Sequence, residues 1–537
     1  MDTMSPSAPS RRLSALYAIV AALAIFGGLH DMAQWFRGVP IDFRAFYAAG
    51  EVVAVDRADP YRVQPLLRRE NTMPLVHEAL PIVAPAPLPP YDLVALEALG
   101  RTPLVVAEAL FGCITLAAGV ATGMALARGS KLPLTVGLAV AFIAVLSYAI
   151  VLGQIAPISI AALACAAWAL CENRASLGAA ALLIALVEPH VAAGAVIATL
   201  LVVPRARPVL LAGLVAYAIV PTLLFGTGQW LEYAHTLALH ATAEVHFPPQ
   251  YSLTWFLVAL GVAEKPALLA GSLSTVVLTL ASLAVVVVAR ERSVRSGAVV
   301  LLPALAALIG GTFIHPHQLV FAIVPALWYL RPARRTFDST WIVGMLVVPF
   351  TLLIGFDPHW PNRDASAIIA VTMVTAWCTI RAWSASLGTA IAVRKAWLVT
   401  SVLGAFFFTF VALHYRLHTA ISPIAPIPAD PNENASIAWR AYSDDIAAQL
   451  HSTAYLVAIK IATVFALVAT AVITSRKLLA ADERALGSAT EPERAGEPRR
   501  FVGERLSGTR RLDSAASNVT SFQDSRLESR RARGRSS

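Results

Sequence analysis

The sequence predicts an all-α polytopic membrane protein, and three observations lead to that fold class. Hydrophobic residues make up 57% of the 537 residues and charged residues only 14%, whereas about a quarter of a soluble globular protein is charged. Apolar runs of about the length of a membrane-spanning helix recur along most of the chain. Lys and Arg gather in the short loops between those runs. A chain of this composition cannot cover a water-facing surface, so lipid is its expected solvent.

The first apolar run, residues 13–29, follows Arg11 and Arg12, as in a membrane anchor whose N-terminus stays in the cytoplasm. Residues 30–102 come next and form a polar, proline-rich stretch. We therefore expect a large first loop outside the cytoplasm. Further apolar runs follow at 103–127, 133–152, 156–170, 177–203, 208–225, 266–289, 297–330, 340–356, 365–383, 397–413 and 454–474.

Two of these runs contain a polar break. EPH at 188–190 interrupts run 177–203, and HPH at 315–317 interrupts run 297–330, which is also too long for one helix. Proline removes a backbone hydrogen bond and a charged side chain at mid-bilayer is costly, so each run is interpreted as a pair of shorter helices. Splitting both runs gives 14 segments, and we expect about 12 to 14 transmembrane helices.

The split agrees with the tendency of cytoplasmic loops to be basic. Leaving only run 177–203 whole puts the basic loops RERSVR at 290–295 and RPARRT at 331–336 outside. Both termini are cytoplasmic in the split arrangement, and we expect a multi-pass protein of an inner or plasma membrane. Every strongly basic short loop then falls on one side, namely Arg128 with Lys131, Arg174, Arg205 with Arg207, Arg290 with Arg292 and Arg295, Arg331 with Arg334 and Arg335, and Arg394 with Lys395.

Residues 475–537 are rich in Arg, Glu, Ser and Gly and nearly free of aromatic residues, which is typical of a disordered cytoplasmic tail. Residues 1–474 are then one polytopic transmembrane domain. The tail supplies part of the net charge of +9. Contact with the inner leaflet, or passive solvation, explains this charge more simply than nucleic acid does, so no nucleic-acid partner is expected.

The polar interruptions of the apolar pattern share one face in this topology. The first loop, GQIAP at 153–157, the breaks EPH and HPH, and DPHWPNRD at 357–364 all lie at or near the outer boundary. Chance scattering would divide them between the two faces. We therefore expect a pocket that faces the periplasm or the exterior, where helices end and ionisable groups reach water.

Asp42 begins a stretch, residues 42–49, in which Phe43, Phe46 and Tyr47 share one face of a short interfacial helix. A carboxylate at this place can reach the head group of an amphipathic substrate. The alternative is that Asp42 is the N-cap of the helix, a common position for aspartate. The residue taken alone favours the cap.

His315 and His317 flank a proline, a spacing that suits either metal ligands or hydrogen bonds to a phosphate or a sugar hydroxyl. The motif lacks the carboxylate or cysteine partners that make a metal site specific, so no metal is expected. Arg363 has the forked donor group that binds phosphate oxygens, although plain solvation is the simpler interpretation.

Other polar residues have equally divided interpretations. Glu188 and Gln154 either cap a half-helix or bind a sugar hydroxyl. Lys460, in the last apolar run, either snorkels or pairs with a carboxylate inside the bundle. Asp59 precedes Pro60 in a turn signal and is expected to be structural. No glycine-rich loop of the Walker or Rossmann type occurs, which disfavours a reaction that uses a nucleotide. An enzyme on the outer face would then need a donor substrate that the membrane supplies.

Several stretches together resemble a known family. DFRAFYAAGEVVAVDRADPYR at 42–62 resembles the first outer loop of glycosyltransferase family 87, the polyprenyl-phosphate-mannose-dependent α-mannosyltransferases of the C-type glycosyltransferase superfamily. The likeness spans about residues 12–335. Five further stretches keep the family's order: PPYDLVALEALG at 89–100, LGQIAPISIAALA at 152–164, VEPHVAAGAVIATLL at 187–201, SLTWFLVALGV at 252–262 and HPHQLVFAIVPALWYL at 315–330.

The resemblance implies a C-type glycosyltransferase bundle whose large first outer loop carries the catalytic aspartate, here Asp42. That residue would be the general base, taking a proton from the acceptor hydroxyl as its oxygen attacks the anomeric carbon with inversion. His315 or His317 would hold the donor phosphate or the acceptor. The expected substrate-binding residues are Tyr47, Gln154, Glu188, His190, His315, His317 and Arg363.

Glu188 departs from the family pattern, which has a lysine before Pro189. The change inverts a charge near the expected donor phosphate, so either another cation such as Arg363 compensates or the substrate differs. The leaving group is a lipid monophosphate, for which a divalent metal is not obligatory. No cofactor beyond the lipid-linked donor is therefore expected.

The leading hypothesis is a membrane hexosyltransferase, by the resemblance a mannosyltransferase, that moves a hexose from a polyprenyl phosphate to an extracytoplasmic lipid, glycan or protein acceptor. Its partners are then this donor, the acceptor and membrane lipids.

The alternative is a polytopic transporter or flippase of lipid-linked sugars, which should place polar residues near the bilayer midplane in related halves. Polar groups on one face and an unrepeated first loop favour the transferase. A structural membrane component is a third interpretation, and it leaves the outer polar groups without a purpose.

Overall fold

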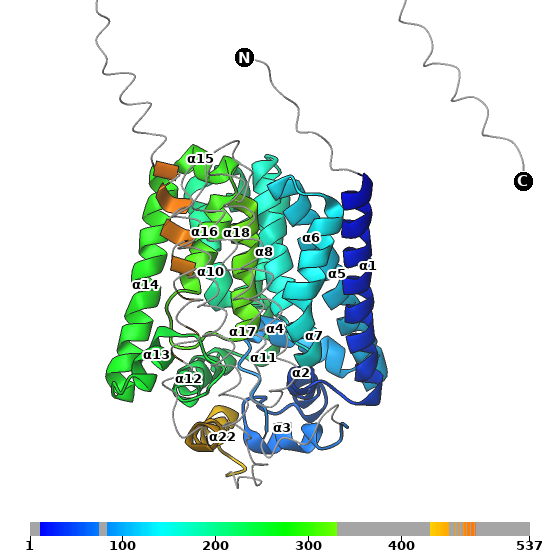
Figure 1. Ribbon diagram of the computed structural model, residues 1–537. Helices are drawn as coiled ribbons and strands as arrows, with labels where there is room; N and C mark the ends of the chain where they lie inside the picture. The colour runs from blue at the N-terminus through cyan, green and yellow to red at the C-terminus, as the bar shows by residue number, and fades with distance from the viewer. Residues whose placement is uncertain are drawn as a thin grey trace, which may run out of the picture. The chain divides into compact units, whose positions relative to one another are not determined.

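Helices make up every named element of the structure (Figure 1). The computed structural model describes residues 11–74, 83–329 and 430–449, with single residues between Val457 and Leu479. Contacts separate a compact unit, Met1–Ala485, from a second unit, Leu486–Ser537, which lies outside the described residues. No strand occurs in the described part, in agreement with the predicted all-α class.

Long helices run alongside one another as a bundle (Figure 1). Each apolar run within the described ranges is helical at nearly the predicted place. The predicted segments 340–356, 365–383 and 397–413 lie outside the described residues. The bundle helices are α1 (Arg11–Ala33), α5 (Leu104–Ser130), α6 (Leu134–Val140), α7 (Ser147–Leu152), α8 (Ala156–Cys171), α9 (Ala175–Ala185), α10 (Pro189–Val202), α11 (Arg207–Phe225), α14 (Glu264–Val288), α16 (Ala298–Ala307) and α18 (Ile323–Tyr329).

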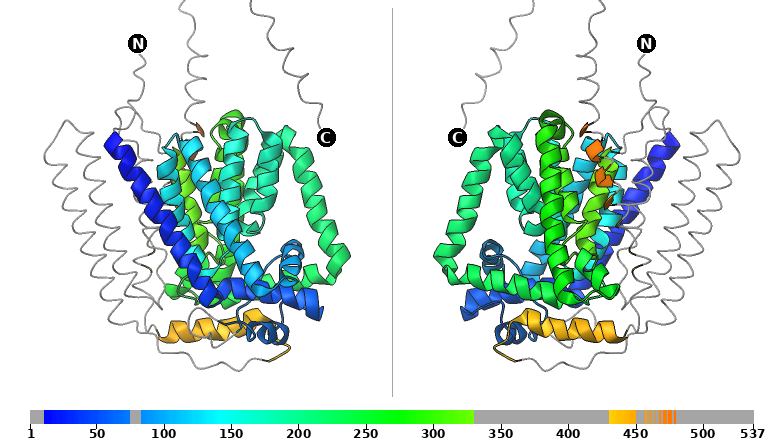
Figure 2. Two further views of the ribbon diagram at one scale, coloured as in Figure 1. Left: turned by 90° about the vertical axis from the view of Figure 1, so that its right-hand side faces the viewer. Right: turned by 90° about the vertical axis from the view of Figure 1, so that its left-hand side faces the viewer.

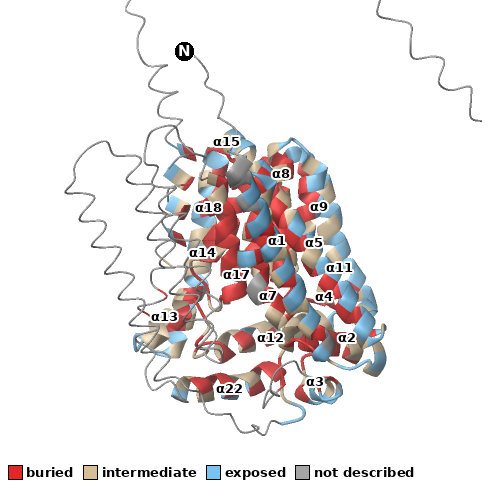
Figure 3. Cartoon of the chain, turned by 45° about the vertical axis from the view of Figure 1, so that its right-hand side comes forward, coloured by how far each residue is buried: buried red, intermediate tan, exposed pale blue. Residues whose placement is uncertain are grey.

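Among the described helices, three are long and apolar enough to span a membrane: Leu104–Ser130, Pro204–Phe225 and Glu264–Val288. Their outer faces expose large apolar side chains, with Leu223 79% and Val288 66% exposed. Exposed positions also follow α9 and α11 along their length (Figure 3). Water-facing surfaces rarely carry apolar patches of this extent, so lipid suits this belt better than water.

Both predicted breaks are present. α9 ends at Ala185 and α10 begins at Pro189, which makes Glu188 the residue that precedes the first turn. α16 ends at Ala307, and the short helix α17 (Pro316–Leu319) begins only after an irregular segment. Proline fits the first position of a helix because the N–H it lacks would have no partner within the helix. The polar side chains of both breaks therefore lie at helix ends.

The described part of the predicted first loop is largely helical and lies across one end of the bundle (Figures 1 and 2). The basic helix α15 (Arg290–Arg295) lies at the opposite end. The charge pattern predicts this separation of the basic helix from the first loop. Which side of the membrane each end faces stays a prediction. We call the helices at this end the polar layer, which consists of α2 (Ile41–Glu51), α3 (Val63–Glu70), α4 (Pro90–Gly100), α12 (Gly228–Ala243), α13 (Leu253–Ala259) and α22 (Ala435–Gln449).

Aromatic packing holds α2 against the bundle. Phe43 is fully buried, and its ring centroid lies 4.9 Å from that of Phe111 on α5 and 6.1 Å from that of Trp35. Trp35 in turn donates its indole N–H to the carbonyl of Ile150 in α7, at 2.9 Å. Offset and tilted rings at such distances stabilise a contact beyond the area they bury. The start of α2 is therefore fixed next to the end of α7.

The N-cap of α2 is Pro40, so the interpretation of Asp42 as the helix cap is wrong. The helix begins at Ile41, and no side chain accepts a hydrogen bond from its first N–H groups at the cap position. Asp42 lies in the first turn instead, where the positive end of the helix dipole favours a carboxylate. Its side chain is left for other partners.

Candidate functional site

Asp42 meets Gln154, although 112 positions separate them in the sequence. Gln154 follows a left-handed turn at Gly153, whose φ is 72°. A Cβ at Gly153 would lie 2.6 Å from Cβ of Phe43 and 2.9 Å from Cβ of Pro40, so only glycine lets this turn approach the start of α2. Nε2 of Gln154 then donates to Oδ2 of Asp42 at 2.5 Å. Two predicted site residues are thus in direct contact.

The environment of Asp42 changes its acidity. Burial raises the pKa of Asp42 from its ordinary value of 3.8 to about 7, and the hydrogen bond from Gln154 offsets part of that rise. The residue remains partly exposed, so a ligand can reach it. A carboxyl group with this pKa is divided between acid and carboxylate near neutral pH, which suits a group that accepts a proton in a reaction.

Glu188, His190 and Gln318 form a second polar group, where α10 and α17 begin. Nε2 of Gln318 donates to Oε2 of Glu188 at 3.0 Å, and Nε2 of His190 lies 3.3 Å from the same oxygen. Oε1 of Gln318 accepts the backbone N–H of His315 at 2.9 Å. Within the described ranges, no Lys or Arg pairs with Glu188. An amide therefore holds this buried carboxyl group in place of a cation.

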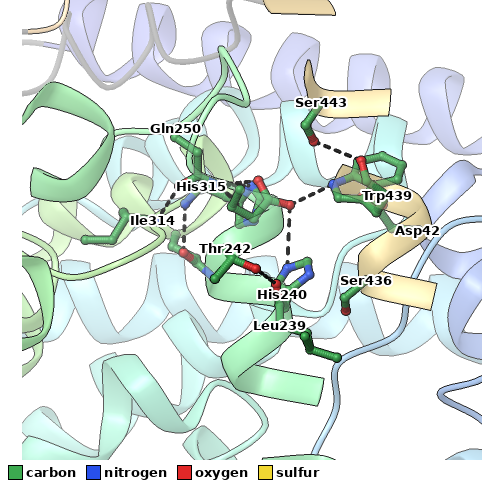
Figure 4. Close-up of polar contacts among 12 residues, drawn as sticks. Asp42, Leu239, His240, Thr242, Gln250, Ile314, His315, Ser436, Trp439 and Ser443 are labelled. Carbon is green, nitrogen blue, oxygen red and sulfur yellow. Dashed lines mark hydrogen bonds and ion pairs between the residues drawn. The ribbon is translucent and has the colours of Figure 1, made fainter. Parts of the chain in front are cut away.

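A third group surrounds Glu244, which follows α12 and is only 1% exposed (Figure 4). Oε1 of Glu244 accepts the indole N–H of Trp439 from α22 at 2.8 Å, and Oε2 accepts Nε2 of Gln250 at 2.7 Å. Nε2 of His240, one turn earlier on α12, lies 3.6 Å from Oε1 of Glu244. Nε2 of Gln250 also lies 3.3 Å from each ring nitrogen of His315. The HPH break and α12 therefore meet at one carboxyl group.

Aromatic rings join the second and third groups. The ring centroid of Phe313 lies 5.4 Å from that of His190 and 5.3 Å from that of His240. It lies 6.3 Å from that of His315, which stacks on His317 at 5.1 Å. Three histidines from three separate stretches of the chain thus surround one phenylalanine, and His317 stacks on one of them.

Asp42 belongs to the same region as Glu244. Burial is the main cause that raises the pKa of Glu244 to about 8, the charge of Asp42 adds to the rise, and the hydrogen bonds from Gln250 and Trp439 oppose it. We call these residues the polar cluster, which consists of Asp42, Gln154, Glu188, His190, His240, Glu244, Gln250, His315, His317, Gln318 and Trp439.

Tyr47 is a predicted substrate-binding residue that is not brought into the polar cluster. Tyr47 donates its hydroxyl to the carbonyl of Thr102 at 2.7 Å and stacks on Phe43, so its contacts hold α2 in place. Arg363 lies outside the described residues.

Lys460 does not snorkel, and it pairs with no carboxylate in the part of the chain that the structure describes. It is 5% exposed and donates to the backbone carbonyls of Pro248 and Gln250. Its Nζ also lies 3.6 Å from the ring centroid of Trp255. Carbonyl oxygens and an aromatic face take the role that a carboxylate was expected to have.

The sequence reasoning missed His240, Glu244, Gln250 and Trp439. One signal was present, because His240 and Glu244 are four residues apart and so lie on one face of a helix. Trp439 offered no such signal, since 195 positions separate it from the carboxylate that it binds.

Comparison with family models, with curated proteins and with solved structures finds no match to this chain.

Proposed function

We propose that the protein is a membrane glycosyltransferase that moves a hexose, mannose in the first instance, from a polyprenyl phosphate to a hydroxyl-bearing lipid, glycan or protein acceptor. The observation that carries the proposal is the Asp42 carboxyl group, held by Gln154 where the polar layer meets an apolar helix bundle. A lipid-linked donor can lie along such a bundle while its sugar reaches the layer. The stretch 42–62, which resembles family 87, begins at this aspartate.

In the proposed reaction, Asp42 is the general base. It takes the proton from the acceptor hydroxyl, the hydroxyl oxygen forms a bond to the anomeric carbon, and the bond from that carbon to the donor phosphate breaks with inversion. The lipid phosphate leaves with the electron pair. Gln154 engages Oδ2 of Asp42, so Oδ1 is the oxygen assigned to the acceptor.

Unpaired polar atoms at the edge of the cluster suit a ligand rich in hydroxyl groups. Oδ2 of Asp92 and Nε2 of Gln229 are buried without a hydrogen-bond partner in the described part of the chain. A buried polar atom left in this state costs about 1–3 kcal/mol. The charge of Glu188 adds to the burial that raises the pKa of Asp92, so these two acids are close neighbours. Sugar hydroxyls both donate and accept, and therefore satisfy both kinds of atom.

A transfer assay tests the proposal. Purified protein is given radiolabelled polyprenyl-phosphate-mannose, or the corresponding glucose donor, and a membrane lipid extract, and label should move from the donor to a new product. Absence of transfer from every polyprenyl-phosphate hexose, together with movement of the sugar-lipid across vesicles, overturns the transferase and favours a flippase.

The polar layer is proposed to face the periplasm or the exterior, because the basic loops lie at the other end of the bundle. A cysteine placed at the exposed Ala58, between α2 and α3, should then react with a membrane-impermeant maleimide in intact cells. Labelling of this cysteine only after the membrane is opened would reverse the assigned orientation.

The rate of transfer should depend on pH through Asp42. Because burial raises the pKa of Asp42 to about 7, the group is protonated at lower pH and cannot accept a proton. We expect kcat/KM to fall about tenfold per pH unit below this value and to level off above about pH 8. A profile that stays flat down to about pH 5 would contradict the raised pKa.

A further inference from the structure

Two imidazoles and one carboxylate converge within the polar cluster. The possible ligand atoms of His240, Glu244 and His315 all lie within 4.8 Å of one another. His240 and Glu244 come from one turn of α12 and its end, whereas His315 comes from the break before α17. Ligands that converge from separate segments are the usual construction of a protein metal site.

The spacing fits a small cation. Donor atoms around a tetrahedral ion with bonds of about 2.0–2.1 Å lie about 3.3 Å apart. Nε2 of His240 and Oε1 of Glu244 are 3.6 Å apart, which is too long for a hydrogen bond and close to that spacing. The ligand atom of His315 lies within 4.8 Å of the other two, so it needs a shift of about 1.5 Å at most to reach that spacing.

His240 lacks hydrogen-bond partners that would explain its burial. The residue is 5% exposed, and its Nδ1 is buried without a partner in the described part of the structure. A buried polar atom of this kind calls for an explanation, and a metal ion is one of the known ones. An ion bound through Nδ1 after a flip of the ring gives this atom a partner.

The surroundings of Glu244 resemble those of a metal-binding carboxylate. Donors from Trp439 and Gln250 fix the orientation of its two oxygens and leave further lone pairs on each. Among residues 11–74, 83–329 and 430–449, no Lys or Arg pairs with Glu244 or with Asp42. Two neighbouring carboxyl groups without a cation are costly to ionise in a buried site, and a divalent ion supplies the missing charge.

We propose that His240, Glu244 and His315 bind one divalent transition-metal ion, with Zn²⁺ as the representative. Two imidazoles and a carboxylate suit Zn²⁺ and its neighbours, whereas Mg²⁺ and Ca²⁺ prefer oxygen ligands alone. Three protein ligands leave a position for water or for a phosphate oxygen. A role in binding the donor phosphate rests on the proposed function, but the binding of the ion does not.

Metal content tests the proposal directly. Protein without a histidine tag is stripped with EDTA, loaded with Zn²⁺, desalted and analysed for metal. Wild type should retain about one ion per chain, and His240→Ala and Glu244→Gln should each lower the content by at least about tenfold. The control is His235→Ala, which removes an exposed histidine from the same helix and should keep the wild-type content. Wild type that retains no ion, or a Glu244→Gln variant that retains one, overturns the proposal.

A second measurement uses only the wild-type protein, in case a variant does not fold. Co²⁺ added to the stripped protein should produce the visible absorption of a Co²⁺ site of low coordination number. Zn²⁺ should abolish this absorption by displacing Co²⁺, and Mg²⁺ should not. Absence of this absorption also overturns the site. Neither measurement contains a sugar donor, so failure of the transfer reaction leaves the metal result unchanged, and a negative metal result leaves the transfer assay unaffected.

Discussion

Replacing Asp42 by Asn is expected to lower the rate of hexose transfer by about 10²- to 10⁴-fold, because an amide cannot take the proton of the acceptor hydroxyl. The change keeps the size of the side chain, and the amide oxygen still accepts the hydrogen bond that Gln154 donates at 2.5 Å. The fold and the binding of substrates should therefore persist. Initial rates with saturating polyprenyl-phosphate-mannose measure the effect, which should appear in kcat with little change in KM.

A matched control comes from Asp59, which lies in the turn between α2 and α3. Its Oδ1 accepts the backbone N–H of Tyr61 at 3.0 Å, as the turn signal predicts, and asparagine preserves this acceptor. The partly exposed ion pair of Asp59 with Arg62 contributes little to stability. Asp59→Asn should therefore transfer at nearly the wild-type rate. Full activity of the Asp42→Asn variant would exclude Asp42 as the base.

Replacing Glu70 by Gln is expected to lower the free energy of unfolding by about 3–5 kcal/mol, because it leaves the charge of Arg44 buried without its partner. Nη2 of Arg44 donates to Oε2 of Glu70 at 2.8 Å, and the two side chains are 6% and 0% exposed. This pair joins α2 to α3 and so supports the helix that carries Asp42. Denaturant unfolding of the protein in detergent, followed by tryptophan fluorescence, measures the loss.

Two further variants separate charge from packing at this pair. The double variant Arg44→Met with Glu70→Leu removes both charges and should recover most of the lost stability, since apolar residues of similar volume replace a buried ion pair at little cost. Glu291→Gln breaks an exposed pair with Arg295, whose side chain is 79% exposed, and should cost less than about 1 kcal/mol. A double variant as unstable as the single one would assign the effect to packing and not to the unpaired charge.

The local features of the fold follow from local sequence. Glu188 before Pro189 and His315 before Pro316 predict helix ends, and both breaks occur where expected because proline cannot continue an existing helix. The aromatic spacing after Asp42 predicts a short helix over residues 42–49, and the structure has a helix at Ile41–Glu51. The interpretation of Asp42 as the N-cap was wrong, because the N-cap is Pro40 and the helix begins at Ile41.

The contacts of the polar cluster were less accessible to sequence reasoning. Asp42 and Glu188 were predicted site residues, but the partners Gln154 and Gln318 became definite only when the positions of helix ends were known. Trp439 lies in a helix separated from α12 by nearly 200 residues, and it reaches Glu244 only through the packing of α22 on the polar layer. Such contacts depend on long-range packing, which leaves no periodic signal in the sequence.

The sequence by itself therefore determined the all-α class, the apolar segments, their two polar breaks and the sorting of basic loops away from acidic and histidine residues. These properties depend on local composition, on the spacing of apolar residues and on the positions of proline, each of which acts over a few residues. Only the tertiary structure decided that the side chains of His240, Glu244 and His315 converge, and that the charge of Asp42 acts on Glu244. The reason is that a buried carboxyl group takes its partners and its pKa from whatever packs around it, and packing joins segments that are far apart in the chain.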